Sequence, residues 1–280
     1  MESPLDVALN GVPHSSLSVL NRALHYGDGL FESLRVVQGQ PIALALHLKR
    51  LRRGAELLQF SEEAISPLPI ELDRFCQGRE TGILKVILTR SAEQRGYRIP
   101  DKSDNQRVLF WYPDHTLSKE QYDEGVSVCR CRTLLPNQGP IAAVKSLNRL
   151  PQVMARSEWR DEAIYEGLMF NERYDVVEGT QSNLFLIVEE KVLTPNVDNY
   201  GIAGLMRERV MTQLQQWRVP LSVVTLQESD LLRATSMFLT NSLIGILPVR
   251  QYLQQRFSSH CLVQKLQSHF HPHMALPWRA

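Results

Sequence analysis

Two ionisable residues, Lys145 and Glu178, occur in sequence contexts that could make them part of a catalytic site. Lys145 follows the small apolar run "IAAV" and precedes a segment typical of a helix. A lysine amine is a nucleophile or a base only where its surroundings disfavour the ammonium form, and burial among apolar residues such as those of this run has that effect. Glu178 ends a β-rich run in "VVEG", where a buried carboxylate would need a cationic partner such as a protonated pyridine nitrogen. Taken singly, each residue is more often an ordinary surface side chain.

A third group of residues could bind a phosphate. The stretch "GIAGLMRERV" offers backbone amides at a helix start, where the helix dipole favours an anion. The turn "TNS" at 240–242 follows a strand and adds amide and hydroxyl donors. Arg50 in "LHLKRL" could complete this set of phosphate ligands with its forked guanidinium. Together with Lys145 and Glu178, these are the groups that a pyridoxal phosphate site requires.

The composition limits the class of protein. The chain has 280 residues, 43% of them hydrophobic and 22% charged, with a formal net charge of +1, which argues against nucleic acid or an anionic membrane as the main partner. Four scattered cysteines favour a reducing cytoplasm over a disulfide scaffold. The N-terminal stretch has no signal-peptide pattern, and the most apolar window, "SMFLTNSLIGILPV", is too short and too polar to span a bilayer. We expect a soluble cytoplasmic protein.

Strand-like and helical runs alternate without a repeat, which predicts a mixed α/β (α+β) fold in two lobes. We expect a smaller N-terminal α/β lobe over 1–113, a linker over 114–121 and a larger C-terminal lobe over 122–280, because "PDHTLSKEQYDEG" is polar and contains proline and glycine. The smaller lobe should hold two short strands within 31–44, a helix over 46–60 and a strand pair over 82–91 and 107–113. The predictions for the larger lobe are strands over 126–133, 162–170, 174–179, 182–195, 221–226 and 237–241, and helices over 201–217, 228–235 and 259–270.

Three further patterns have simpler explanations. Cys129 and Cys131 lie on one face of an expected strand, but without a second Cys or His pair they do not make a zinc site. The run "HFHPH" near the C-terminus is interpreted as a polar tail. The basic run "KRLRR" at 49–53 is a solvated helix face with one phosphate-binding arginine.

The motifs in this chain also resemble a known family. They are "NRALHYGDGLFESLRV", "LHLKRL", "LKVILTRSAEQRGY", "KSLNRLPQVMARSEW", "VVEGTQSNLFL", "TPNVDNYGIAGLMRERV" and "TNSLIGILPV", in family order from about Asn21 to Val249. The sequence resembles the class IV (fold-type IV) pyridoxal-phosphate enzymes. The resemblance implies a two-lobed fold with pyridoxal 5′-phosphate in the cleft, and a homodimer with its sites near the subunit interface.

The resemblance also implies roles for individual residues. Lys145 would form the Schiff base with the cofactor and act as the catalytic acid and base, and Glu178 would keep the pyridine nitrogen protonated. The residues that would hold the phosphate are Arg50, the amides of Ile202 and Ala203, and the turn of Asn241 and Ser242.

Two stretches bear on the reaction. "KSLNRLPQV" and "SAEQRGYRIP" are similar to the pattern of the 4-amino-4-deoxychorismate lyases within this class. The resemblance therefore implies the conversion of aminodeoxychorismate to 4-aminobenzoate and pyruvate, a step of folate biosynthesis. Part of "KSLN" also occurs in D-amino-acid aminotransferases, so an aminotransferase of D-amino or branched-chain amino acids stays open. A third alternative is a cofactor-binding homodimer without catalytic activity.

A substrate with two carboxylates needs cations at the site. Arg95 in "QRGY" is the first candidate and Arg90 in "LTRS" the second. From their positions in the motif, Tyr26 and Phe31 are expected to line the pocket, and the Ser33 hydroxyl to assist protonation. No metal is expected.

Overall fold

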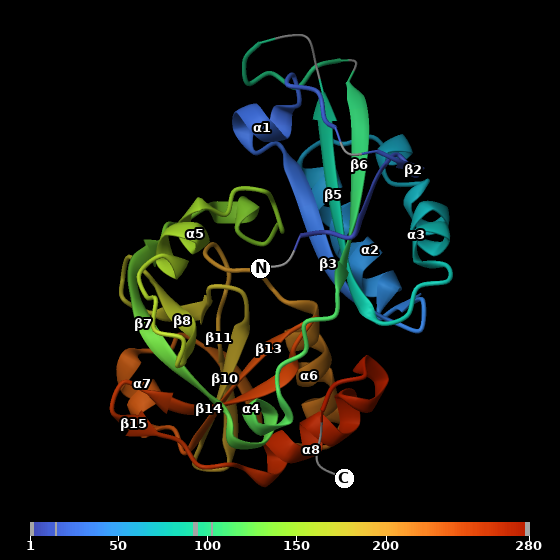
Figure 1. Ribbon diagram of the computed structural model, residues 1–280. Coiled ribbons are helices and arrows are strands. Elements are labelled where there is room, and N and C mark those ends of the chain that lie inside the picture. Colours follow the sequence, from blue (N-terminus) through green and yellow to red (C-terminus); the bar gives the residue numbers. More distant parts are fainter. Residues whose placement is uncertain (1–2, 15, 92–94, 102, 278–280) are drawn as a thin grey trace. The chain divides into compact units, whose positions relative to one another are not determined.

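The computed structural model describes residues 3–14, 16–91, 95–101 and 103–277 (Figure 1). Their contacts divide the chain into two compact units. Unit 1 comprises 1–115 and the short segment 144–148, and unit 2 comprises 116–143 and 149–280. The chain therefore leaves unit 2 before Val144 and returns to it after Asn148.

Unit 1 is built on an antiparallel sheet of six strands. In spatial order these are β2 (Val12–Pro13), β1 (Asp6–Leu9), β6 (Asp104–Pro113), β5 (Gly82–Ser91), β3 (Gly29–Val37) and β4 (Gln40–Pro41). Burial alternates along β5, where Leu84, Val86 and Leu88 are buried and the residues between them are half-buried. This period of two is what a sheet with one fully covered face requires.

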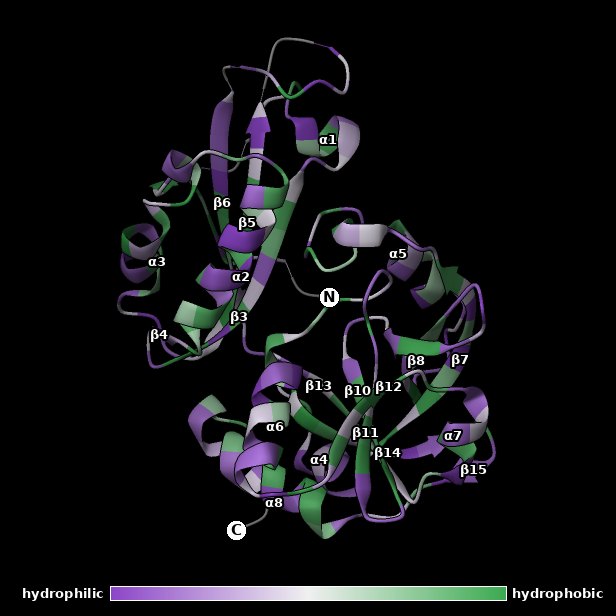
Figure 2. Ribbon diagram, turned by 180° about the vertical axis from the view of Figure 1, so that it is seen from behind, coloured by the Kyte–Doolittle hydropathy of each residue, from purple (hydrophilic) through white to green (hydrophobic). Residues whose placement is uncertain are grey.

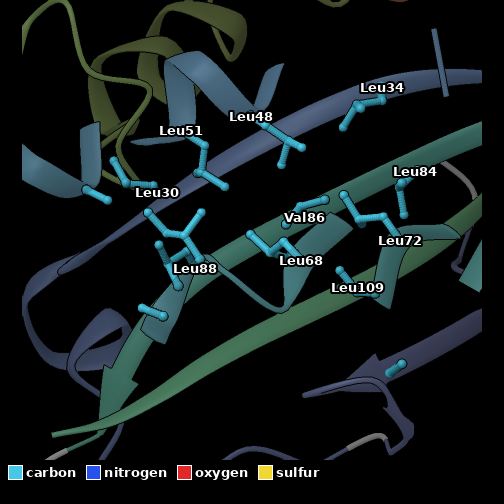
Figure 3. Packing of buried hydrophobic residues seen from close by; sticks show 14 of the residues in the cluster. Leu30, Leu34, Leu48, Leu51, Leu68, Leu72, Leu84, Val86, Leu88 and Leu109 are labelled. Carbon is cyan, nitrogen blue, oxygen red and sulfur yellow. The ribbon is translucent and has the colours of Figure 1, made fainter. Parts of the chain in front are cut away.

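Helices cover that face of the sheet. They are α2 (Leu44–Leu57) and α3 (Leu68–Cys76); the short α1 (Arg22–Tyr26) and the 3-10 turn η1 (Glu62–Ala64) complete the unit. Leu48, Leu51 and Ala55 of α2 are buried at helical spacing, and α2 carries both hydrophobic and hydrophilic residues around its circumference (Figure 2). Figure 3 shows the labelled leucines of α2 and α3 packed over β3, β5 and β6.

The segment 144–148 joins unit 1 through β3. The Phe31 N–H donates to the Lys145 carbonyl at 2.9 Å, and the Leu147 N–H donates to the Gly29 carbonyl at 3.0 Å. Val144 is buried in the same hydrophobic core as the leucines of Figure 3. These bonds hold the Lys145 backbone alongside Phe31.

Unit 2 contains a mixed sheet of nine strands. The path is β12 (Leu221–Val224), β11 (Lys191–Pro195), β10 (Asn183–Val188), β13 (Ser236–Asn241), β14 (Gly245–Tyr252), β7 (Val126–Leu135), β8 (Ile164–Asn171) and β9 (Val176–Gly179), with β15 (Gln255–Arg256) paired to β14. The β11/β12, β14/β7 and β7/β8 pairs are parallel, and the others are antiparallel.

Unit 2 contains five helices within the described residues. They are α4 (Lys119–Glu124), α5 (Leu150–Arg156), α6 (Leu205–Gln216), α7 (Glu228–Arg233) and α8 (Cys261–Phe270), with 3-10 turns η2 (Gly139–Ile141) and η3 (Pro272–Met274). Leu205, Met206, Val210 and Leu214 of α6 are all buried, as core residues at this spacing should be. No helix within the described ranges is long and apolar enough to cross a membrane.

The types of the predicted helices and strands agree with the structure, but the predicted boundary between the two lobes does not. Thr116 begins unit 2, and α4 starts inside the stretch interpreted as a linker over 114–121. Ser118 and Gln121 form a capping box, a helix-start pattern that the polar composition concealed. A single boundary also misplaces Lys145, since the segment that carries it belongs to unit 1.

The interpretation of "HFHPH" as a polar tail is wrong for its central residue. His271 is 0% exposed. Its Nε2 accepts a hydrogen bond from the Ile246 N–H of β14 at 3.0 Å, and its Nδ1–H donates to the Pro277 carbonyl at 2.7 Å. The ring thus ties the end of the chain to the sheet.

We predict that His271→Ala lowers the free energy of unfolding by about 3 kcal/mol, because the buried Ile246 N–H loses its acceptor and a cavity forms. His273, two residues on, is exposed, so His273→Ala should change stability by less than about 0.5 kcal/mol. Urea denaturation followed by circular dichroism measures both variants. Equal effects of the two substitutions would contradict the structural role of His271.

Candidate active site

Lys145 lies against an aromatic ring in unit 1. Its side chain is half-buried, and Nζ lies 4.1 Å from the centroid of the Phe31 ring. Phe31 and Ser33 are half-buried residues on the same face of β3, opposite to the face that carries Glu32. The predicted site residues Lys145, Phe31 and Ser33 therefore come from two paired segments of one unit.

Arg50 is held by a buried carboxylate that the sequence analysis did not single out. Its Nε and Nη2 donate to the two Glu32 oxygens at 2.7 and 2.6 Å, a bidentate pair. His47 lies one helical turn before Arg50 on α2, and its Nδ1 contacts Glu32 Oε2 at 2.7 Å. Glu32 thus fixes the plane of the guanidinium, and the role of Arg50 as a phosphate ligand stays a prediction.

The charges in this cluster follow from burial and hydrogen bonding. Burial alone would raise the pKa of Glu32, but hydrogen bonds from Arg50 and His47 and the positive charge of Arg50 lower that pKa to about 2. Burial also lowers the pKa of His47, and the charges of Arg50 and Lys145 lower it further against the opposing pull of Glu32. We infer a neutral His47 whose Nδ1–H donates to an ionised Glu32.

Glu178 in unit 2 sits in a tight backbone cradle. The residue is 5% exposed, and its Oε2 accepts from the Ile202 N–H at 2.9 Å and from Asn183 Nδ2 at 3.4 Å. A Cβ on Gly201 would lie 2.9 Å from the carboxyl carbon, so this approach requires glycine. The carboxylate is therefore fixed in direction before any cofactor arrives.

The Ile202 N–H donates to Glu178 in this structure, and its role as a phosphate ligand stays a prediction. The amides at the helix start lie further along the chain. Helix α6 begins at Leu205 after Gly204, which has no side chain to cap it, and its first intrahelical bond runs from Glu208 N to Gly204 O. The N–H groups of Leu205 and Met206 therefore have no acceptor within the helix.

The turn after β13 keeps its predicted place. The Asn241 side chain accepts from the Leu243 and Ile244 amides at 2.8 and 2.9 Å, and donates from Nδ2 to the Gln181 carbonyl at 3.1 Å. Its amide group thus shapes the turn, and the role of Asn241 and Ser242 as phosphate ligands stays a prediction. The role of Ala203, an exposed residue of the loop before α6, stays a prediction.

A fully buried carboxyl organises the loop that follows Glu178. Glu166 on β8 accepts from the Thr180 hydroxyl at 3.2 Å, the Gln181 N–H at 2.6 Å and the Ser182 hydroxyl at 2.8 Å. Burial raises the pKa of Glu166 to about 7, although these three donors oppose the shift. Since Gln181 also receives the Asn241 side chain, Glu166 supports both the Glu178 strand and the Asn241 turn.

The two arginines predicted to bind substrate carboxylates differ in their burial and in their contacts. Arg90 is 1% exposed and is bound to Asp28 at 3.1 Å and to two backbone carbonyls, so it holds the fold together and is not available to a substrate. Arg95 is exposed in a loop that is tied to α1, since the Gly96 N–H donates to the Tyr26 hydroxyl at 3.1 Å. The substrate-binding roles of Arg95 and Tyr26 stay predictions.

Several features of unit 2 fit a pyridoxal phosphate. A buried, oriented carboxyl group suits a pyridinium nitrogen, and an uncapped helix start suits a phosphate. Thr240 Oγ1, beside the Asn241 turn, is buried and has no hydrogen-bond partner among the described residues. Within those residues there is no cluster of three or more His, Cys, Asp or Glu side chains that could hold a metal ion.

Comparison with known proteins places this arrangement in a family. The family model "Amino-transferase class IV" matches residues 29–252. The chain belongs to the class IV aminotransferase family. The aminodeoxychorismate lyase of Vibrio harveyi is 30% identical over 245 residues, which cover 86% of this chain and 89% of that protein.

Solved structures of relatives agree with the two-sheet fold. The 4-amino-4-deoxychorismate lyase of Pseudomonas aeruginosa superimposes with a TM-score of 0.91 and 37% identity, covering 95% of this chain and 98% of the other. The T.th. branched-chain amino acid aminotransferase, solved with pyridoxamine 5′-phosphate, matches with a TM-score of 0.85 and 20% identity, covering 98% and 95%. The fold is fold-type IV, and the family binds pyridoxal phosphate.

Glu32, His47 and Glu166 were not predicted as site residues, although the sequence around Glu32 and His47 contains a signal for them. His47 and Arg50 are three residues apart on a predicted helix and so share a face. Glu32 lies between the apolar residues of a strand, where a charged side chain needs a partner. Glu166 lies in an apolar run, and only the fold reveals that a distant turn supplies its three donors.

We predict that Glu32 makes the protein acid-sensitive. Its folded-state pKa of about 2 is below the ordinary value of 4.5, so its contribution is complete above pH 4.5 and is lost as the pH falls toward 2. Over that interval the unfolding free energy of the wild type should fall by about 3 kcal/mol more than that of Glu32→Gln. Urea titrations at several pH values measure the difference, and parallel curves would contradict it.

Glu166 should show the opposite dependence on pH. Its folded-state pKa of about 7 exceeds the ordinary 4.5, so its stabilising effect is present below pH 4.5 and is lost as the pH rises to 7. The wild type should therefore lose about 3 kcal/mol relative to Glu166→Gln over this range. The same urea series tests this, and the prediction fails if the difference between the two proteins is independent of pH.

Proposed function

We propose that this chain is an aminodeoxychorismate lyase that converts 4-amino-4-deoxychorismate to 4-aminobenzoate and pyruvate. The observation that carries the proposal is the 37% identity to the Pseudomonas aeruginosa lyase over 95% of this chain, against 20% for the T.th. aminotransferase over a similar length. The oriented groups at Lys145, Arg50 and Glu178 support an active enzyme over a cofactor-binding protein without catalysis, since such a protein has no chemical need for them.

The proposed reaction is an elimination that needs no second substrate. The proton leaves the ring carbon that bears the amine, the bond from the neighbouring ring carbon to the enolpyruvyl oxygen breaks, and a proton returned to the leaving group gives pyruvate. Pyridoxal phosphate, when bound, supplies an electron sink for the pair left by that proton. An aminotransferase would instead need a keto acid to complete its cycle.

Each role in the reaction is assigned to a residue of this chain. The Lys145 amine binds the cofactor covalently and, once released, takes and returns the proton. Glu178, held by the Ile202 amide, keeps the pyridine nitrogen protonated. For the phosphate we propose Arg50, the backbone amides of Ile202 and Ala203, and the turn of Asn241 and Ser242. The Ser33 hydroxyl, on the same strand face as Phe31, is proposed to assist protonation.

The cytoplasmic location and the homodimer stay predictions. Helix α5 presents Leu150, Val153 and Met154 to solvent, with exposed fractions of 66%, 62% and 54%. Neighbouring apolar side chains of this kind are typical of a surface that a second protein covers. A second copy of the chain is the partner we propose.

Purified, cofactor-loaded protein should convert fresh aminodeoxychorismate to equal amounts of 4-aminobenzoate and pyruvate over many turnovers, with no keto acid present. Lys145→Ala should lower this rate by about 100-fold or more and abolish the borohydride-reducible link to the cofactor, because the only proposed base is lost. Chromatography and a coupled pyruvate assay follow both products. Absence of both products, together with amino transfer from D-alanine or a branched-chain amino acid to 2-oxoglutarate, would assign the protein to the aminotransferases.

A further inference from the structure

Asn183 begins β10 and is 5% exposed, and its side-chain amide joins two segments that are far apart in the sequence. Its Nδ2 donates to the Ile202 carbonyl at 2.9 Å and to Glu178 Oε2 at 3.4 Å, and its Oδ1 accepts from the Gly204 N–H at 3.0 Å. The Ile202 N–H donates to the same Glu178 oxygen at 2.9 Å. One buried amide therefore ties the carboxyl group of β9 to the loop that leads into α6.

Gly204 shows how closely this amide and the loop fit together. A Cβ at Gly204 would lie 2.1 Å from Asn183 Oδ1, far inside van der Waals contact. The Gly204 backbone has a φ of −67° and a ψ of 141°, values that residues with a side chain also adopt. Glycine is therefore required at this position by the approach of Asn183 and not by the backbone conformation.

The end of β13 lies beside Asn183 as well. In the β10/β13 pair Asn183 is directly opposite Thr240, so the two side chains project from the same face of the sheet. Thr240 is fully buried, and its Oγ1 has no hydrogen-bond partner among the described residues. Asn183 is therefore next to each part of unit 2 that is proposed for the cofactor: Glu178, the loop 202–204 and the turn after β13.

The chemistry of an amide suits this position. An amide donates to the Glu178 carboxyl and to a backbone carbonyl while it accepts from a backbone N–H, and it stays neutral at every pH of interest. An ionised aspartate could accept from the Gly204 N–H but could not donate to Glu178. The side chain of Asn183 thus fixes both segments without adding a charge next to a phosphate or a ring nitrogen.

We propose that Asn183 is a positioning residue that sets both ends of the cofactor site in unit 2, the Glu178 carboxyl group for the ring nitrogen and the loop 202–204 for the phosphate. This inference rests on the proposed function, which assigns those two ends, and extends it to a residue that acts through them. A site whose groups are held in place before the ligand arrives binds more tightly, because less ordering accompanies binding. Since both ends depend on one amide, a change on the loop side also affects the ring side.

The test uses two ligands that each occupy one end of the site. Pyridoxal lacks the phosphate, and inorganic phosphate lacks the ring. Full-length protein freed of cofactor is titrated with pyridoxal, followed by absorbance, and with inorganic phosphate, followed by calorimetry. Asn183→Ala should weaken the binding of both ligands by about 3- to 10-fold, the change that one or two orienting hydrogen bonds supply. A loss of affinity for only one ligand, or for neither, would overturn the proposal.

Gly204→Ala perturbs the same contact from the loop side. The added methyl group displaces the Asn183 side chain, so this variant should weaken pyridoxal binding by a similar factor although the substitution lies in the loop. In the double variant that carries both substitutions, the methyl group meets no amide. Its affinity for pyridoxal should therefore equal that of Asn183→Ala alone. Additive losses would contradict coupling through this contact.

Asn171, at the end of β8, provides the matched control. It is 4% exposed, and its side chain also makes three hydrogen bonds: Oδ1 accepts from the Arg173 and Asp175 amides, and Nδ2 donates to Asp175 Oδ2. Asn171→Ala should lower the stability in urea about as much as Asn183→Ala does, but it should bind both ligands as the wild type does. Equal losses of affinity in the two variants would show a general effect of destabilisation and would overturn the positioning role.

The two proposals fail in different ways, because these titrations measure binding and not turnover. If the protein makes no 4-aminobenzoate but the variants bind as expected, the lyase assignment is wrong and the role of Asn183 stands. If the lyase reaction proceeds and Asn183→Ala binds both ligands as the wild type does, the role of Asn183 is wrong. A wild type that binds neither pyridoxal nor inorganic phosphate would also overturn that role.

Discussion

The backbone pairing of the segment 144–148 with β3 is the constraint on which the candidate site depends. Two hydrogen bonds at 2.9 and 3.0 Å hold this segment beside Gly29 and Phe31, and Val144 anchors it in the core. Without that pairing, Lys145 would be a long flexible side chain on a loop. With it, the amine lies over an aromatic ring at a definite place on the sheet. Positioning of this kind supplies much of what a catalytic group contributes.

Buried acids organise both units, and they do so under opposite electrostatic conditions. Glu32 is surrounded by donors of which one carries a full positive charge, so ionisation is favoured strongly enough to overcome burial. Glu166 has three donors and no cationic partner in its hydrogen bonds to the described residues, so burial dominates and its proton is held more tightly. The number of hydrogen bonds is similar, and the difference between the two groups is the charge of the donors.

The sequence predicted the elements that carry the candidate residues better than it predicted the hydrogen-bond partners of those residues. Lys145, Arg50 and Glu178 stand in local patterns of apolar runs and turns that their own neighbours create, and the strand alternation and helical leucines indicated the element types. The commitment of the Ile202 amide to Glu178 depends on a contact across 24 positions, which no local pattern contains. The burial of His271 likewise depends on β14. Local sequence patterns indicate which residue types lie near each other along the chain, whereas tertiary contacts decide which hydrogen-bond partner each donor and acceptor has.

The path of the chain also bears on the order in which the protein can assemble during synthesis. The strands of the first unit are complete once residue 113 has been made, but the segment that pairs with β3 emerges only after β7 of the second unit. The nascent first unit can therefore form its sheet while the edge of β3 that will receive Lys145 still lacks its partner. A chain cut at His115 would contain Arg50 and Phe31 without Lys145. The two units are separate in their packing, but unit 1 contains a segment that is encoded within the sequence of unit 2. Recombination between relatives at residue 115 would therefore exchange Lys145 together with unit 2.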